Sequence, residues 1–149
     1  MVFPTLAWAS FDTKPTLGPL KIERHDVGPN DIHVAIKYCG VCHSDIHVAT
    51  NDLSSTIYPC VPGHEMVGVV DQAGAKVTKF AVGDVVGVGC FTDSCRDCHE
   101  CDTGEEQYCE KGMTLTYNSE TKVGCCDWVQ FGFTGAAPVV SIFLAFVPF

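Results

Sequence analysis

The stretch IHVAIKY, residues 32–38, decides the class of fold that the sequence predicts. Its apolar side chains recur at every second position, at Ile32, Val34, Ile36 and Tyr38, which is the period of a strand with one buried face. The preceding residues 28–31, Gly-Pro-Asn-Asp, have the composition of a turn. We therefore expect a half-buried β-strand over residues 32–38.

Short apolar segments on both sides of this stretch have the same character. We expect further strands at residues 20–27, 66–70 and 85–88, which glycine, proline or aspartate residues separate. Helical periodicity is almost absent, and the best candidate is a short turn that opens at Ser44, whose hydroxyl can cap the following amides. Many short strands with few helices favour a mainly β fold, a closed or partly closed β-barrel.

The composition narrows the class of protein. The chain has 149 residues, the usual size of one domain, and 46% hydrophobic against 18% charged residues can fill a core. A formal net charge of −9 argues against a nucleic-acid partner, because phosphates attract a basic surface. Residues 1–10 lack the pattern of a signal peptide, and the longest apolar run, 136–149, is too short to span a bilayer. We expect a cytoplasmic protein with no membrane partner.

Four of the ten cysteines lie in CRDCHECDTGEEQYC, residues 95–109, a stretch too polar to build a core of its own. They follow the pattern C-x2-C-x2-C-x7-C, in which the two short gaps let thiolates converge and the long gap lets the chain return to complete a tetrahedron. Four sulfurs with no open position describe a structural zinc site, and the metal would replace the missing core. The expected ligands are Cys95, Cys98, Cys101 and Cys109.

Disulfides and an iron–sulfur cluster are the alternatives for these thiols. Cytoplasmic thiols stay reduced, which disfavours disulfides. Iron–sulfur proteins share the C-x2-C-x2-C run, but there the fourth cysteine usually follows after about three residues and precedes proline, whereas Glu110 follows here. His99 lies between the cysteines, and we expect it to be solvated rather than a ligand.

A second group of metal-binding residue types lies in CGVCHSDIH, residues 39–47, and PCVPGHE, residues 59–65. Cys42 and His64 are suitable zinc ligands on separate segments, as in a site built between loops. Glu65 or Asp45 could orient the histidine or act as an additional ligand. Taken alone, a cysteine or a histidine is equally compatible with a structural role.

These motifs resemble those of a known family. GHEMVG, residues 63–68, followed by Gly74 and Val77, matches the zinc-containing alcohol dehydrogenase signature G-H-E-x2-G-x5-G-x2-V without a mismatch. The combination of GVCHSDIH, YPCVPGHE, VGDVVGVGC, DSCRDCHEC and EEQYC is similar to the cinnamyl-alcohol-dehydrogenase branch of the medium-chain dehydrogenase/reductase superfamily. The resemblance covers residues 4–122 and implies a GroES-like, partly closed β-barrel with a cysteine-rich zinc lobe.

The resemblance also implies a site and an activity. Cys42 and His64 would bind a catalytic zinc, Glu65 would be an exchanging carboxylate, and Asp45 would support the site from behind. The four lobe cysteines would bind a structural zinc. The implied function is a zinc-dependent alcohol dehydrogenase or aldehyde reductase that uses NADP and a small alcohol or aldehyde, and the full-length family is compatible with a homodimer.

The proton route is likewise implied by the resemblance. Ser44 would pass the alcohol proton from the substrate toward the cofactor ribose, and His47 would hand it to solvent. Such chemistry needs a metal because an alcohol is too weak an acid near neutral pH, whereas zinc lowers the pKa of bound water from 15.7 to about 7. Without the resemblance, Ser44 reads as a helix cap and His47 as a surface imidazole.

The sequence departs from the family pattern in its second half. It contains no G-x-G-x-x-G, since the nearest stretch, GVGCFT at residues 87–92, lacks the last glycine. The family's third zinc-binding cysteine has no counterpart, although Cys125 or Cys126 could replace it. We expect a catalytic domain over residues 1–122, with its zinc lobe at 90–112 and without a Rossmann domain. Residues 123–149 would be an atypical apolar tail left by truncation or a frameshift.

Two readings of the function follow from this departure. In the first, the chain is the catalytic domain of the dehydrogenase, and we expect no turnover by these 149 residues alone because half of the cofactor cleft is missing. In the second, the chain is a non-catalytic zinc-binding domain.

Overall fold

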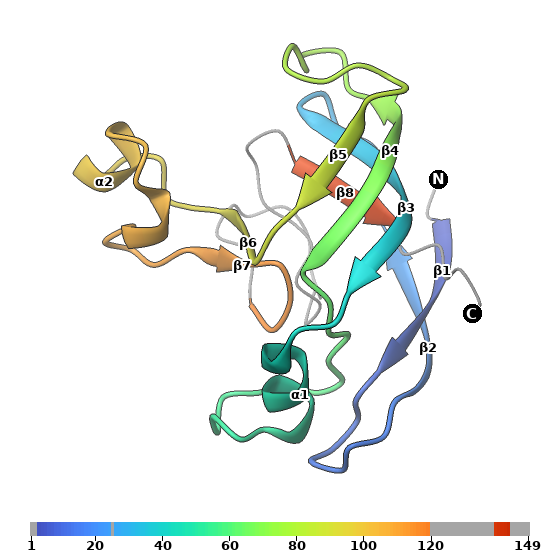
Figure 1. Cartoon of the computed structure of the whole chain (residues 1–149). Helices are drawn as coiled ribbons and strands as arrows, with labels where there is room; N and C mark the ends of the chain where they lie inside the picture. The colour runs from blue at the N-terminus through green and yellow to red at the C-terminus, as the bar shows by residue number, and fades with distance from the viewer. Residues whose placement is uncertain (1–2, 25, 120–138, 144–149) are drawn as a thin grey trace.

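The computed structural model describes residues 3–24, 26–119 and 139–143. Figure 1 shows its elements in space. In chain order they are β1 (Phe3–Ala9), β2 (Gly18–Arg24), β3 (Asp31–Gly40), α1 (His43–Thr50), β4 (Glu65–Ala73), β5 (Val85–Val88), β6 (Phe91–Asp93), α2 (His99–Asp102), the 3-10 turn η1 (Glu106–Tyr108), β7 (Thr114–Leu115) and β8 (Val139–Phe143). The prediction of a mainly β fold is confirmed.

The largest sheet has four strands in the order β5-β4-β3-β8. β4 pairs antiparallel with both β3 and β5, and β8 runs parallel to β3. Two smaller sheets, β1-β2 and β6-β7, are antiparallel pairs. In Figure 1, α1 lies beyond one end of β3, and the segment with α2 projects sideways from β6 and β7.

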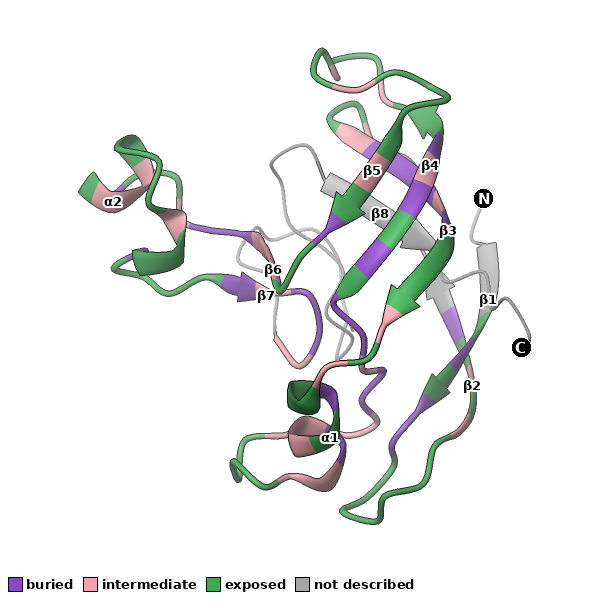
Figure 2. Cartoon of the chain, viewed as in Figure 1, coloured by how far each residue is buried: buried purple, intermediate pink, exposed green. Residues whose placement is uncertain are grey.

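The core of the large sheet follows the predicted alternation in β3. Ile32, Val34 and Ile36 are buried, and they pack with Met66, Val70 and Val88 from β4 and β5. Figure 2 shows the resulting alternation of buried and exposed segments along β4. A second cluster joins Ala7, Ala9 and Ile22 of the β1-β2 pair to Val61.

Tyr38 does not continue this alternation. It was expected on the buried face, but its side chain is 76% exposed. The pairing of β3 with β4 shifts register between Ile36 and Tyr38, so Lys37 is a bulge residue and Tyr38 lies opposite the exposed Val67. An extra residue in one strand turns the side chains beyond it to the other face.

Of the predicted strands, 85–88 coincides with β5, while 66–70 lies inside the longer β4 and 20–27 overlaps β2. A helix is present where the turn was predicted to open at Ser44, but the capping role predicted for the Ser44 hydroxyl is wrong. α1 begins at His43, and its N-cap is Cys42. The Asp45 carboxylate accepts a hydrogen bond from the backbone N–H of Cys42 at 3.0 Å, and this bond secures the helix start without the Ser44 hydroxyl.

The cysteine-rich stretch lies outside the sheets, as predicted. Residues 95–109 form α2 and η1 but no strand, and they connect β6 to β7 (Figure 1). We call residues 95–109 the lobe and the β6-β7 pair its stem. Figure 2 shows mostly exposed or intermediate residues in the lobe. No helix among the described residues has the length and apolar character needed to cross a membrane.

The apolar segment 123–149 is described only at residues 139–143. These residues form β8, in register from Asp31 opposite Val139 to Ala35 opposite Phe143, so they are part of the large sheet. Residues 120–138 and 144–149, with Cys125 and Cys126, lie outside the described residues. The predicted domain boundary at residue 122 stays a prediction.

Gly68 and Gly87 provide a matched test of packing between the strands. A Cβ at Gly68 would lie 2.6 Å from a methyl carbon of Val34 and 2.7 Å from the backbone oxygen of Ala35, whereas at Gly87 the nearest atom is 3.7 Å away. We expect Gly68→Ala to lower the free energy of unfolding by about 1–3 kcal/mol because the core is overpacked. Gly87→Ala should leave it unchanged or raise it by up to about 1 kcal/mol. Urea unfolding of both variants at the same zinc concentration measures the difference, and equal effects would contradict this account.

Candidate metal centres

The corner between β3 and α1 places the first candidate ligand. β3 ends at Gly40, and Cys42 follows in an extended conformation as the residue that caps α1. The backbone N–H of Asp45 donates to the carbonyl of Cys42 at 3.1 Å, while the Asp45 carboxylate accepts from the Cys42 N–H. This reciprocal pair fixes the backbone of Cys42 at the start of the helix.

His64 reaches the same place from a loop that leads into β4. Gly63 has a φ of 126°, which side-chain-bearing residues rarely adopt, and a Cβ there would lie 3.1 Å from the Cys39 sulfur. The Asp45 Oδ1 accepts hydrogen bonds from the Gly63 N–H and from the His64 Nδ1–H, each at 3.0 Å. One buried carboxylate therefore joins the start of α1 to the loop before β4.

This bond also determines which nitrogen of His64 can bind a metal. A carboxylate only accepts hydrogen bonds, so Nδ1 must carry a proton, and the lone pair of the neutral ring lies on Nε2. A carboxylate behind a metal-binding histidine is a common arrangement that fixes the orientation of the ring. Burial lowers the pKa of His64, but the charge of Asp45 and its hydrogen bond outweigh burial and raise this pKa overall.

Three potential ligands converge at this point. One ligand atom each from Cys42, His64 and Glu65 lies within 4.8 Å of the others. His64 is buried, Cys42 is half-buried and Glu65 is exposed. Sulfur, imidazole and carboxylate are the donors that zinc prefers, and three protein ligands are typical of a zinc that keeps a position open. The residues present therefore fit a zinc ion of the catalytic kind.

The Ser44 hydroxyl lies beside the Cys42 thiol, with Oγ 3.5 Å from Sγ. Hydrogen bonding from the Ser44 side chain and backbone lowers the pKa of Cys42, and His64 contributes in the same direction. A lowered thiol pKa favours the thiolate, which is the form that binds metals. Ser44 therefore contacts the candidate metal centre, although its expected role as a helix cap is wrong.

His47 lies one helical turn after Ser44. Its Nδ1 is 2.7 Å from a carboxylate oxygen of Asp52, and its ring centroid is 4.8 Å from that of His43. The hydrogen bond with His47 is the main cause of a lowered pKa for Asp52. The sequence analysis missed Asp52. The signal available was Asn51, which ends α1 in a left-handed conformation with a φ of 61° and turns the chain back toward His47.

Tyr117 is a second residue that the sequence analysis missed. Its ring centroid is 5.5 Å from that of His64, with 37° between the ring planes, and the side chain is buried. Burial raises the pKa of Tyr117, and its interactions with Asp45 raise this pKa further. No local pattern predicts this contact, since Tyr117 follows β7 and His64 precedes β4.

The lobe gathers its four cysteines as the spacing predicts. Their sulfur atoms all lie within 4.8 Å of one another. The Sγ of Cys101 is 3.5 Å from that of Cys98 and 3.9 Å from that of Cys95, and the eight cysteines among the described residues are free thiols. The Ser94 hydroxyl, 3.3 Å from Cys101 Sγ, is the main cause that lowers the pKa of Cys101 to about 6. These four sulfurs fit a structural zinc.

Two ion pairs lie outside the sulfur cluster and connect the lobe to neighbouring residues. The Arg96 guanidinium donates two hydrogen bonds to the buried Asp93 of the stem, at 2.9 and 2.7 Å. Lys111 and Asp97 form an exposed pair at 2.9 Å. His99 is exposed and lies outside the cluster of sulfurs, in agreement with the expectation that it is solvated.

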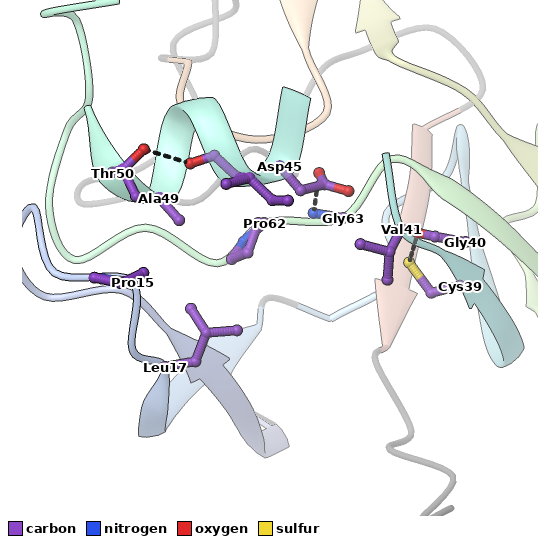
Figure 3. A pocket seen from close by; sticks show the side chains of 11 residues that line it. Pro15, Leu17, Cys39, Gly40, Val41, Asp45, Ala49, Thr50, Pro62 and Gly63 are labelled. Carbon is purple, nitrogen blue, oxygen red and sulfur yellow. Dashed lines mark hydrogen bonds between the residues drawn. The ribbon is translucent and has the colours of Figure 1, made fainter. Parts of the chain in front are cut away.

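An apolar pocket of about 330 Å³ lies behind the first centre, between α1 and the segment that connects β1 to β2. Figure 3 shows Pro15 and Leu17 on one side and Ala49 and Thr50 of α1 on the other. Asp45 contributes to its wall, but none of the candidate ligands lines it. The pocket is therefore not where the metal chemistry would take place.

Comparison with known proteins connects this geometry to a family. The family model of the alcohol dehydrogenase GroES-like domain matches residues 28–140. The chain is 52% identical over 115 residues to the aldehyde reductase YahK of Escherichia coli (strain K12), covering 77% of this chain and 33% of the relative.

Two solved structures share the fold. The structure of CAD from Helicobacter pylori complexed with NADP(H) has a TM-score of 0.73 and 42% identity, over 80% of this chain and 34% of that chain. The structure of a cinnamyl alcohol dehydrogenase from Sorghum bicolor has a TM-score of 0.73 and 45% identity, over 76% and 32%.

The chain thus spans about a third of the length of the proteins that it matches. The family match includes both candidate metal-binding segments and extends to residue 140 in β8. The resemblance predicted from the motifs is confirmed, and so is the GroES-like, mainly β fold with its cysteine-rich lobe. The chain belongs to the family of alcohol dehydrogenase GroES-like domains, in the cinnamyl-alcohol-dehydrogenase-like branch of the medium-chain dehydrogenase/reductase superfamily.

Proposed function

We propose that the chain is the metal-binding domain of a zinc-dependent alcohol dehydrogenase or aldehyde reductase. The observation that carries this proposal is the convergence of Cys42, His64 and Glu65, with Asp45 holding both segments from behind. The names of the relatives, an aldehyde reductase and cinnamyl alcohol dehydrogenases, give the class of reaction and of substrate: a small alcohol or aldehyde.

Each centre would bind one zinc ion. Cys42 and His64 would hold the catalytic ion with Glu65 as an exchanging ligand, and the four lobe cysteines would hold a structural ion. The catalytic zinc, when bound, makes an alcohol acidic enough to lose its proton near neutral pH, or polarises an aldehyde carbonyl in the reverse direction. The structural zinc holds together a lobe that contains few buried apolar side chains.

Ser44 and His47 would move the proton between substrate and solvent. The Ser44 hydroxyl lies beside Cys42, where it can accept the alcohol proton while donating its own. His47, one turn further along α1 and exposed to solvent, would receive that proton and release it to water. Asp52 accepts a hydrogen bond from the Nδ1 of His47, which orients the ring.

The hydride would pass to or from NADP. This assignment is supported by the Helicobacter pylori relative, whose structure contains NADP(H). No dinucleotide-binding glycine motif occurs in the present sequence, so the nicotinamide cofactor would be held by other parts of a complete enzyme. A cytoplasmic location and a homodimeric full-length enzyme complete the proposal, and both rest on the family resemblance.

Zinc content tests the two centres. We expect the purified, reduced chain to contain two zinc ions per molecule and Cys42→Ala to contain one, because the lobe retains its four ligands. Cys39→Ala is the matched control. It removes a nearby thiol that belongs to neither cluster, so this variant should still contain two zinc ions. Elemental analysis with a count of free thiols measures both quantities.

A wild-type chain with a single zinc ion would contradict the catalytic role and favour the non-catalytic zinc-binding domain. No zinc, or disulfides among the lobe cysteines, would contradict the assignment of the lobe. A coloured preparation with iron and sulfide would indicate the iron–sulfur alternative instead.

The pKa of His64 determines how protons compete with the metal. In the metal-free chain we expect it above the ordinary value of 6.5, because Asp45 favours the charged ring. In Asp45→Asn we expect it to be lower than in the wild type, because burial then opposes only the smaller contributions of Cys42. The raised pKa stabilises the metal-free fold below pH 6.5, and this contribution is lost as the pH rises through the folded-state pKa. An NMR titration of the His64 ring protons, assigned with His64→Gln, measures the shift. The same pKa in both proteins would contradict the role of Asp45.

A further inference from the structure

Tyr117 contacts the first metal centre without belonging to the proton route or to the ligand set. Its side chain is 6% exposed, and its ring lies against His64 with the centroids 5.5 Å apart. The contact restricts the rotation of the imidazole, whose remaining nitrogen must point at a metal.

The hydroxyl of Tyr117 interacts with Asp45, the residue that connects Cys42 and His64. A carboxylate offers about four lone-pair sites. Asp45 uses three of them, for the backbone N–H groups of Cys42 and Gly63 and for the Nδ1–H of His64. A tyrosine hydroxyl is a hydrogen-bond donor near neutral pH, and that of Tyr117 interacts with Asp45, so it can donate to the fourth.

The backbone around Tyr117 is anchored on both sides. The preceding residue, Thr116, donates its N–H to the carbonyl of Cys90 at 3.1 Å and its hydroxyl to the carbonyl of Gly89. The following residue, Asn118, accepts the N–H of Ile57 at 2.7 Å and donates to the carbonyl of Ser55 at 3.3 Å. A side chain held this way can act as a fixed support for a neighbouring ligand.

We propose that Tyr117 is a positioning residue for the metal centre formed by Cys42 and His64. Its ring sets the plane of the His64 imidazole, and its hydroxyl fills the last lone pair of Asp45, so that Nε2 of His64 faces the metal. This inference rests on the proposed function, because it assumes that His64 binds zinc. Partners of this kind typically change metal affinity by about 10- to 100-fold when they are removed.

Tyr117→Phe tests the hydroxyl while it keeps the buried ring. We expect the dissociation constant of the second, weaker zinc to rise by about 10- to 100-fold, with the lobe zinc unchanged. Tyr58→Phe is the matched control, because the Tyr58 hydroxyl also supports α1, through a 2.9 Å bond to the Ala49 carbonyl, but makes no contact with Asp45. Competition with a chromophoric zinc chelator measures both constants. An unchanged constant in Tyr117→Phe, or the same loss in Tyr58→Phe, would overturn the proposal.

A second readout uses the metal-free chain and separates this inference from the proposed function. At a pH where His64 is neutral, nitrogen-15 NMR should show its proton on Nδ1 in the wild type and in Tyr58→Phe. In Tyr117→Phe the share of the Nε2-protonated tautomer should increase, because Asp45 becomes free to rotate. If the wild type binds only one zinc, the proposed function fails, while a tautomer unaffected by Tyr117→Phe overturns the role of Tyr117. A wild-type spectrum without a nuclear Overhauser contact between the two rings would also overturn it.

Discussion

The buried carboxylate of Asp45 is the interaction on which the first metal centre depends. It accepts hydrogen bonds from Cys42 at the start of α1 and from Gly63 and His64 in the loop before β4. These segments are separated in the chain by a helix and a long loop. A charged acceptor that is largely removed from water makes stronger bonds than a neutral one and is costly to leave unpaired. The same carboxylate therefore fixes the local fold and brings two candidate metal ligands together.

The two candidate centres differ in how far the surrounding fold is built without a metal. In the lobe, all four sulfurs come from one short stretch that supplies little hydrophobic core, so metal binding and local folding would be one event. At the first centre, the surrounding fold is built without a metal, by the sheet core of Ile32, Val34 and Met66. A preformed site with an exposed third ligand, Glu65, suits a metal that must exchange its partners during a reaction.

The sequence predicted the features that depend on spacing and period, and it missed those that depend on distant contacts. Short gaps between cysteines are sufficient to predict the lobe cluster, and the alternation at Ile32, Val34 and Ile36 predicted the buried face of β3. The bulge that exposes Tyr38 arises from the pairing with β4, which no local pattern encodes. Residues 3–9 and 139–143 form strands because partners exist for them, in β2 and β3, and the short strands of the stem were missed for the same reason. Residue type suggested the association of Cys42 with His64, and the family motifs made it a specific prediction.

The stem connects the lobe to the region of the first candidate centre. An isolated pair of strands as short as β6 and β7 is marginal in water, so it needs support at its outer end and at its base. The lobe supplies the outer support through Arg96 and the buried Asp93, and Thr116 supplies the base through Cys90. Tyr117 is the next residue along the chain, and its ring lies against His64. The lobe and the imidazole of His64 are thus connected along the chain through β7 and the ring of Tyr117.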